Sequence, residues 1–230
     1  MMSDLGQMAM VASVWVIPVI LAITLHEAAH GYAALRFGDD TALRAGRVSM
    51  NPLRHVDPFG TILLPALLLL VRAPFLFGYA KPVPVDFSRL NHPRRDMVWV
   101  AAAGPGMNIF LAVISALLLH ATVYAPGWAA EWLILNLNNS LLINVVLAIF
   151  NMIPLPPLDG GRVAVGVLPD AIAFPLARLE RYGLVILIGA LFLLPFLGAQ
   201  VGLDLNIFHW IIGVPAGALI ELIATLTGHG

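Results

Sequence analysis

Two histidines and a glutamate stand inside a stretch that is otherwise apolar from about residue 8 to residue 37. His26 and His30 are four residues apart, so on an α-helix their side chains face the same way, and Glu27 lies beside the first. Two imidazole nitrogens at this spacing suit one zinc ion, which leaves the glutamate to take a proton from zinc-bound water. The alternative interpretation is two core histidines with a glutamate between them by chance. Ionisable groups in a membrane-spanning helix are costly without partners, so the metal hypothesis requires a third ligand elsewhere in the chain.

The composition indicates an integral membrane protein. Of the 230 residues, 60% are hydrophobic and only 11% are charged, whereas a soluble globular domain carries roughly 25% charged residues. The net charge of −1 gives no indication of nucleic acid as a partner. The absence of cysteine excludes disulfides, thiolate ligands to zinc and cysteine nucleophiles. We therefore expect the lipid bilayer, and not nucleic acid, among the partners of this chain.

The hydropathy pattern predicts an all-α polytopic membrane protein. The apolar runs long enough to cross a bilayer are about 8–36, 97–123, 132–153, 183–199 and 205–227. Residues 59–77 form a weaker run, interrupted by Pro65, and we expect a re-entrant segment there. The prolines and glycines of residues 44–58 and 79–87 predict extended chain and a small membrane-associated β element. The fold class is therefore five to six transmembrane segments with a small β element and a re-entrant segment.

The predicted organisation is a single domain over residues 1–230, with a core at about 8–166 and additional C-terminal helices at about 167–230. The distribution of basic residues predicts its orientation. All twelve lysines and arginines fall either between the first two long runs or before the run at 183–199. The positive-inside rule then places the N-terminus outside the cell and the two histidines near the cytoplasmic face. Five complete crossings would put the C-terminus in the cytoplasm as well.

A second stretch with chemical character runs from Asn151 to Arg162. Its three prolines, at 154, 156 and 157, end the preceding helix and force extended chain at membrane depth, which is tolerated only against protein or a wet cavity. Asp159 follows at the same depth as the two histidines, where a third zinc ligand is required. On its own, Asp159 could equally pair with Arg162; together with the two histidines, metal binding is favoured. Gly160 and Gly161 allow the tight turn that this placement needs.

Three further polar groups are candidates for a role at the site. Asn108 follows a run of small residues that opens the second long span, and it is expected to face the interior of the bundle. There it could be structural or could line the site. Asn151 lies at the start of the proline-rich stretch. His55 and Asp57 could form a second metal pair, but turn-forming residues beside Pro58 are the favoured interpretation.

Taken together, these motifs make the chain similar to the site-2 protease family, the intramembrane zinc metalloproteases that cut transmembrane substrates in regulated signalling. The resemblance covers about residues 8–166 and rests on H-E-x-x-H at 26–30, G-P-x-x-N at 104–108 and N-x-x-P-x-P-x-L-D-G at 151–160. It is closest to the compact prokaryotic type without a PDZ or CBS domain, which implies the prokaryotic inner membrane. It implies His26, His30 and Asp159 as ligands of one zinc ion, Glu27 as the catalytic base and Asn151 as a substrate-contacting residue.

The predicted function is a zinc-dependent intramembrane endopeptidase that hydrolyses peptide bonds in or near transmembrane segments of other proteins. A helical substrate must unwind locally to expose its carbonyls, and we expect residues 44–50, residues 80–86 or the Pro154–Pro157 run to hold it as an added strand. Asn108 or Asn151 is the candidate for stabilising the oxyanion. The alternatives are a zinc-binding protein without proteolytic activity and an ion-coupled transporter. Gly213 and Gly217 have the spacing of a helix-packing motif and make a homodimer a further candidate assembly.

Overall fold

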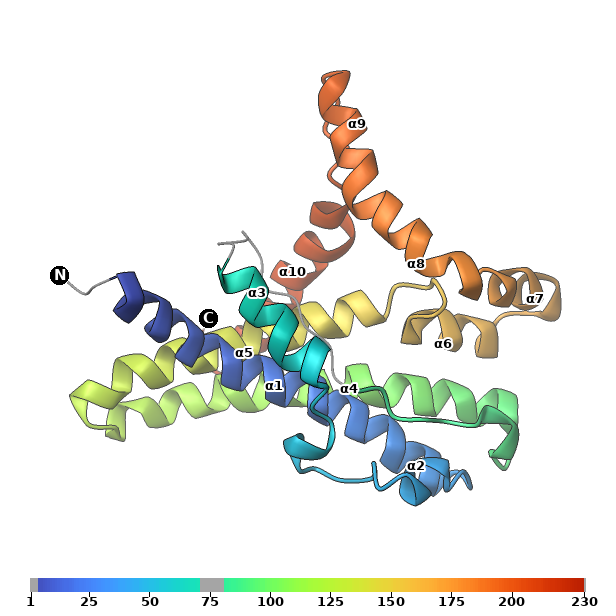
Figure 1. Ribbon diagram of the computed structural model, residues 1–230, viewed down its shortest axis with the longest axis horizontal. Helices are drawn as coiled ribbons and strands as arrows, with labels where there is room; N and C mark the ends of the chain where they lie inside the picture. The colour runs from blue at the N-terminus through green and yellow to red at the C-terminus, as the bar shows by residue number, and fades with distance from the viewer. Residues whose placement is uncertain (1–3, 71–80, 230) are drawn as a thin grey trace.

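The computed structural model describes residues 4–70 and 81–229, and their regular structure is helical (Figure 1). The α-helices are α1 (Asp4–Arg36), α2 (Thr41–Arg44), α3 (Leu64–Leu70), α4 (Pro93–Leu119), α5 (Gly127–Asn151), α6 (Asp159–Val167), α7 (Asp170–Arg178), α8 (Glu180–Ile188), α9 (Leu194–Gln200) and α10 (Val214–Leu226). Short 3-10 turns lie at Pro52–Arg54, Phe87–Arg89 and His120–Tyr124. Wider π-type turns lie at Pro58–Leu63, Gly189–Leu193 and His209–Gly213.

The predicted all-α architecture is confirmed in this part of the chain. Five helical stretches are long and apolar enough to cross a membrane: Ala9–Arg36, Pro93–Tyr124, Ala129–Asn151, Glu180–Gln200 and His209–Leu226. They match the five apolar runs of the sequence to within a few residues. The last two stretches are each built from α-helix and a π-type turn that continue one another. The protein is therefore a multi-pass membrane protein.

The small β element is not found, since the described part of the chain contains no β-strand. Residues 81–86 are extended, as the prolines predict, but Pro82 and Pro84 have no N–H to donate to a neighbouring strand. The N–H of Lys81 is donated to the carbonyl of His55. The segment is therefore held by single hydrogen bonds and not by a ladder.

The re-entrant segment predicted for residues 59–77 is described only in its first half. The turn Pro58–Leu63 leads directly into α3, which ends at Leu70. Residues 71–77 lie outside the described residues, as do the first two residues of the predicted extended run at 79–87. Re-entry of this segment into the membrane therefore stays a prediction.

The core of the molecule forms where α1, α4 and α5 pack against one another (Figure 1). Small side chains dominate the contact: Ala22 on α1 and Ala112 on α4 are fully buried, and Val145 on α5 packs beside Ala112. Without a hydrophobic driving force between helices in lipid, close backbone approach through small residues is what allows tight packing. α10 packs on the α4–α5 face through Ala216.

The C-terminal residues lie at the end of the core where α4 passes to α5. His120 Nε2 is 2.6 Å from the carbonyl of Thr227, and His229 Nε2 is 2.8 Å from the carbonyl of Ala116. The rings of His120 and His229 stack with centroids 4.0 Å apart. Five alternating crossings would bring the C-terminus to the opposite end, so the predicted cytoplasmic C-terminus conflicts with this contact. The reason is that α8 and α9 project away from the core instead of running back along it (Figure 1).

α6 is fastened to the first turn of α4, at the end of the core that faces away from the C-terminus. The guanidinium of Arg94 donates to the carbonyls of Gly166 and Leu168 and pairs with Asp170 at 2.5 Å. An added Cβ at Gly166 would overlap the side chain of Val98, so the two helices are in close contact there. The other end of α6 lies beside α1, where Asp159 approaches His26 and His30.

Candidate metal centre

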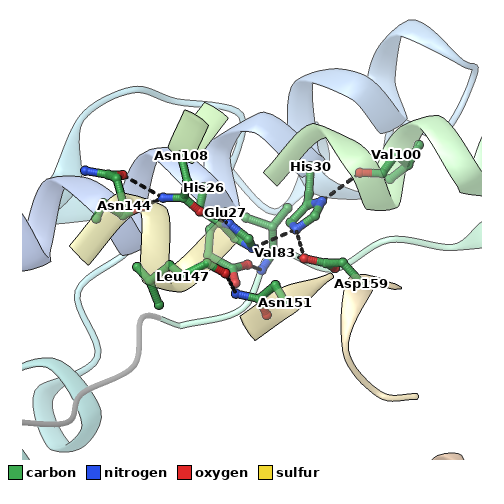
Figure 2. A network of polar contacts seen from close by, with 11 residues as sticks. His26, Glu27, His30, Val83, Val100, Asn108, Asn144, Leu147, Asn151 and Asp159 are labelled. Carbon is green, nitrogen blue, oxygen red and sulfur yellow. Dashed lines mark hydrogen bonds and ion pairs between the residues drawn. The ribbon is translucent and has the colours of Figure 1, made fainter. Parts of the chain in front are cut away.

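His26 and His30 project from the same face of α1, one helical turn apart, as their spacing predicts (Figure 2). Each ring is held by an oxygen atom from α4. His26 Nδ1 is 2.6 Å from Oδ1 of Asn108, and His30 Nδ1 is 2.7 Å from the carbonyl of Val100. Because both partners accept hydrogen bonds, we assign the proton of each ring to Nδ1. The Nε2 lone pairs of both rings are then left free.

Asp159, the first residue of α6, completes a group of three ligand atoms from α1 and α6. Its Oδ2 lies 3.2 Å from His26 Nε2 and 3.4 Å from His30 Nε2, and the two Nε2 atoms are 3.1 Å apart. Oδ2 is buried and accepts no hydrogen bond. Three electron-pair donors therefore converge on one point, which is unfavourable unless a cation lies among them.

The residues present fit zinc. A tetrahedral ion with bonds of about 2.0–2.1 Å keeps its ligand atoms about 3.3 Å from one another, close to the observed separations. Two imidazoles and one carboxylate are the donor set of catalytic zinc sites, which leave a fourth position open. The oxygen bonds to both Nδ1 atoms are the outer partners that such histidines require, because they orient the rings and fix the tautomer.

Gly104 explains how α4 comes close enough to hold both rings. An added Cβ at this position would lie 2.5 Å from His30 Nε2 and 2.6 Å from His26 Nε2, too close for any side chain. The glycine, which is buried, lets the backbone of α4 pass directly against the two imidazoles. The G-P-x-x-N motif therefore combines close approach at Gly104 with a hydrogen-bonding group at Asn108, one turn later.

Asp159 reaches the site because the chain before it is tightly folded. An added Cβ at Gly160 would overlap the carbonyl of Met152, and one at Gly161 would overlap Pro156. The two glycines thus let the first turn of α6 pack onto the proline-rich stretch that follows α5. The sequence predicted a tight turn at these glycines, whereas both lie in the first turn of α6, and their missing side chains allow close packing.

Glu27 lies beside the three ligand atoms and is fixed by a residue far away in the chain. Its Oε2 accepts a hydrogen bond of 2.7 Å from the backbone N–H of Val83, in the extended segment 81–86 (Figure 2). Glu27 and the three candidate ligands line one cavity of about 240 Å³. The rest of its wall is formed by Pro82, Val83, Val85, Phe87, Val100, Ala101, Asn151, Pro157, Leu158 and Arg162.

The two asparagines singled out in the sequence have different positions. Asn151 lines the cavity, and its side-chain amide donates to the carbonyl of Leu147. Asn108 is completely buried behind His26, where its amide nitrogen donates to the carbonyl of Ala22 and to Oδ1 of Asn144. Both amide hydrogens of Asn108 therefore have partners outside the cavity.

Sequence reasoning missed two parts of the site, Asn144 and the N–H of Val83. Asn144 could have been noticed as a polar residue within the apolar run 132–153, seven positions before Asn151 on the same helical face. No local signal marks Val83.

His55 and Asp57 do not join the three-ligand group. The carboxylate of Asp57 accepts hydrogen bonds from the N–H groups of Phe59 and Gly60 and caps the turn.

Comparison with known proteins finds relatives of one kind. The chain is 39% identical over 198 residues to the protein named "Putative zinc metalloprotease YwhC" of Bacillus subtilis, an alignment that covers 81% of this chain and 82% of the relative. It is 29% identical over 209 residues to "Putative zinc metalloprotease Rip2" of Mycobacterium tuberculosis, covering 90% of this chain and 74% of the relative. No protein-family model and no solved structure matches the chain. From the alignment with YwhC and the zinc-type ligand group, the chain belongs to the site-2 protease family of zinc metalloproteases.

Proposed function

We propose that this protein is an intramembrane endopeptidase, which hydrolyses peptide bonds in or near the transmembrane segments of other membrane proteins. One observation carries the proposal: the carboxylate of Glu27 shares a cavity with the three convergent ligand atoms, and this cavity is built on candidate membrane-spanning helices. A zinc site without an adjacent base could be structural. A zinc site with one is equipped for hydrolysis.

In this mechanism His26, His30 and Asp159 would hold the zinc ion, and the bonds of the two rings to Asn108 and Val100 fix the orientations of the histidines. Zinc, when bound, supplies a Lewis acid that polarises the scissile carbonyl and lowers the pKa of water to about 7. Glu27 takes the proton from the attacking water and delivers it to the leaving amine. Asn151 is the asparagine that faces the cavity, and we assign to it the stabilisation of the developing oxyanion or contact with the substrate backbone.

The substrate would enter this cavity in an extended conformation. Segment 81–86 forms one wall, through Pro82, Val83 and Val85, and Pro157 with Leu158 forms another.

Cross-linking tests this path. Because the chain contains no cysteine, a single cysteine can be introduced at any chosen position. A substrate that carries one cysteine near its cut site should form a disulfide with the Val85→Cys variant and with the Leu158→Cys variant. Val123→Cys, which is exposed in the 3-10 turn His120–Tyr124 after α4, is the matched control and should not cross-link.

The basic residues support a cytoplasmic position for the site. Arg36 ends α1, and Arg94 and Arg162 lie at the starts of α4 and α6, so cations gather at the end of the core that carries the ligand group. By the positive-inside rule this end faces the cytoplasm of a prokaryotic inner membrane. The partners are then transmembrane protein substrates and the lipid bilayer. A homodimer through Gly213 and Gly217 stays a prediction.

The decisive experiment measures zinc content and peptide-bond cleavage on the same preparations. Wild type in detergent should hold about one zinc per chain and cleave a single-span membrane protein, with the products located by mass spectrometry. Glu27→Gln should keep the zinc, and its rate of cleavage should fall by a factor of about 10² to 10⁴. Asp159→Ala should lose both. Cleavage by Glu27→Gln at the wild-type rate would overturn the role of the base.

The two alternatives give different results in this experiment. A zinc-binding protein without proteolytic activity would retain zinc and show no cleavage of any membrane protein in either wild type or Glu27→Gln. An ion-coupled transporter would hold no stoichiometric zinc, and its Glu27 and Asp159 variants would change ion flux in vesicles instead. The shared cavity of Glu27 and the ligand atoms favours the protease over both.

A further inference from the structure

Asn144 is a polar residue in the middle of a candidate membrane-spanning helix and is only 1% exposed. A buried amide at this depth is costly unless its donors and its acceptor all find partners. Its Nδ2 lies 2.9 Å from the carbonyl of Ser140, one turn earlier in α5, and its Oδ1 accepts a bond of 2.8 Å from Asn108 on α4. Asn144 does not line the cavity and is not one of the three ligand residues.

The hydrogen bonds of Asn144 and Asn108 form a chain with one direction. Because Asn144 gives its amide hydrogens to Ser140, it offers its oxygen to Asn108. Asn108 in turn donates through Nδ2 to Oδ1 of Asn144 and to the carbonyl of Ala22, so its own oxygen must face His26. The orientation of the Asn108 amide is therefore determined by groups on α1 and α5 and not by His26 alone (Figure 2).

The orientation of the Asn108 amide determines which nitrogen of His26 carries the proton. With an oxygen facing Nδ1, the ring places its proton on Nδ1 and keeps the lone pair on Nε2, the atom aimed at Asp159 and His30. With the amide turned over, an NH₂ group would face Nδ1, and the neutral ring would carry its proton on Nε2. In that tautomer His26 cannot bind a metal ion through Nε2.

We propose that Asn144 is a positioning residue for the metal centre: acting through Asn108, it holds His26 in the tautomer whose Nε2 is free to bind zinc. This inference rests on the proposed zinc site and extends it by one layer of residues, from α1 through α4 to α5. His30 needs no such device, because its Nδ1 donates to a backbone carbonyl, that of Val100, which cannot turn over.

The test measures zinc affinity of the full chain in detergent by competition with a chelator. Asn144→Ala, which removes the amide without adding bulk, should weaken zinc binding by about 10- to 100-fold, the usual effect of losing an outer partner of a metal-bound histidine. Asn144→Asp keeps an oxygen that can accept from Asn108 and should restore most of the affinity. The matched control is Asn136→Ala on the same helix, where a buried asparagine donates to the carbonyl of Trp132. Its zinc affinity should equal that of wild type.

A second measurement does not depend on zinc. Nitrogen-15 NMR of metal-free protein labelled at histidine distinguishes a protonated Nδ1 from a protonated Nε2. Wild type and Asn136→Ala should show the His26 signal of an Nδ1–H ring, and Asn144→Ala should show a population with the proton on Nε2. The His30 signal should be the same in all three, and His26→Ala identifies which signal belongs to His26.

The outcomes separate this inference from the proposed function. If Asn144→Ala binds zinc as tightly as wild type and shows the same His26 signal, the inference is overturned while the zinc protease stands. Equal weakening by Asn136→Ala and Asn144→Ala would also overturn it, because the effect would then follow from removing any buried amide. If wild type binds no zinc, the proposed function fails, and the tautomer measurement still decides whether Asn144 orients His26.

Discussion

The carboxylate of Glu27 and the backbone N–H of Val83 form a hydrogen bond of 2.7 Å between residues 56 positions apart in the chain. It joins the helix that carries both histidines to the extended segment that forms one wall of the cavity. A carboxylate held through one oxygen has its second oxygen left for a proton. The bond therefore gives the candidate base a fixed position, and it can be removed by changing residue 83.

Val83→Pro removes this N–H, and the neighbouring prolines at 82 and 84 make the extended backbone compatible with a third. Proteolysis should fall by about 10- to 100-fold, since a base displaced by about an ångström loses that much. Zinc content should stay at the wild-type level. Val83→Ala, which keeps the N–H and removes most of the buried side chain, is the matched control. Equal losses in the two variants would show that packing, and not the hydrogen bond, is responsible.

Gly104→Ala should abolish zinc binding. The added Cβ would lie 2.5–2.6 Å from the Nε2 atoms of His30 and His26, so either the rings or α4 must move. Gly106→Ala makes the same change two residues along the helix, where an added Cβ meets nothing within 4 Å. Metal analysis of the two purified variants provides the comparison. A full zinc complement in Gly104→Ala would contradict the close approach of α4 to the imidazoles.

Gly183→Ala should destabilise the protein by about 1–3 kcal/mol, the usual cost of overpacking. Gly183 on α8 lies against the carbonyl of Pro156, and an added Cβ would overlap that oxygen. The displaced stretch leads directly to Asp159, so zinc affinity should fall together with stability. Gly189→Ala is the control because an added Cβ there meets nothing within 4 Å. Unfolding in detergent measures stability, and no difference between the two variants would refute this packing.

The stability of the protein should decrease in acid partly through Asp39. Burial alone would raise the pKa of this carboxyl, but bonds from the hydroxyl and N–H of Thr41 and from the N–H of Asp86 outweigh it, and the pKa is lowered. A lowered pKa stabilises the folded state at pH values above the unfolded value of about 3.9. That contribution is lost as the pH falls through the folded pKa.

Asp39→Asn tests this dependence. The variant should be less stable than wild type at pH 7, because its amide oxygen accepts more weakly and its NH₂ group faces N–H donors. The difference in stability should narrow as the pH falls below about 4, where the carboxyl of the unfolded chain takes up a proton while the folded carboxylate, with its lowered pKa, still resists protonation. Unfolding free energies of both proteins between pH 7 and pH 3 provide the measurement. A difference that does not change with pH would exclude the carboxylate as its source.

The expected β element was predicted from extended chain alone, without knowledge of a pairing partner. The prolines at 82 and 84 correctly predicted extended chain, because a fixed φ and a missing N–H exclude a helix. Whether extended chain pairs with a second strand depends on which groups come near it. Here the N–H groups of Lys81, Val83 and Asp86 are donated to three separate acceptors, and no strand forms in the described residues.

The asparagines show the same limit at the site. The sequence predicted that Asn108 would face the interior of the bundle, because lipid cannot satisfy an amide. It left open whether this residue would face the cavity or a neighbouring helix. The packing of α4 against α1 decided that, by placing its oxygen on His26. Asn144, the partner of Asn108 on α5, belongs to none of the three motifs.

The sequence by itself determined the class of the protein, the positions of its membrane helices, the family and the zinc cofactor. Bilayer thickness demands a long apolar run for each crossing, and the helical repeat puts His26 and His30 on one face. The membrane helices and the pair of histidines can therefore each be predicted from a short stretch of sequence. Only the tertiary structure decided that Asp159 reaches the two rings, that Gly104 lies against them and that Val83 holds Glu27. These contacts join segments far apart in the chain, and no local periodicity records which distant groups will meet when the helices pack.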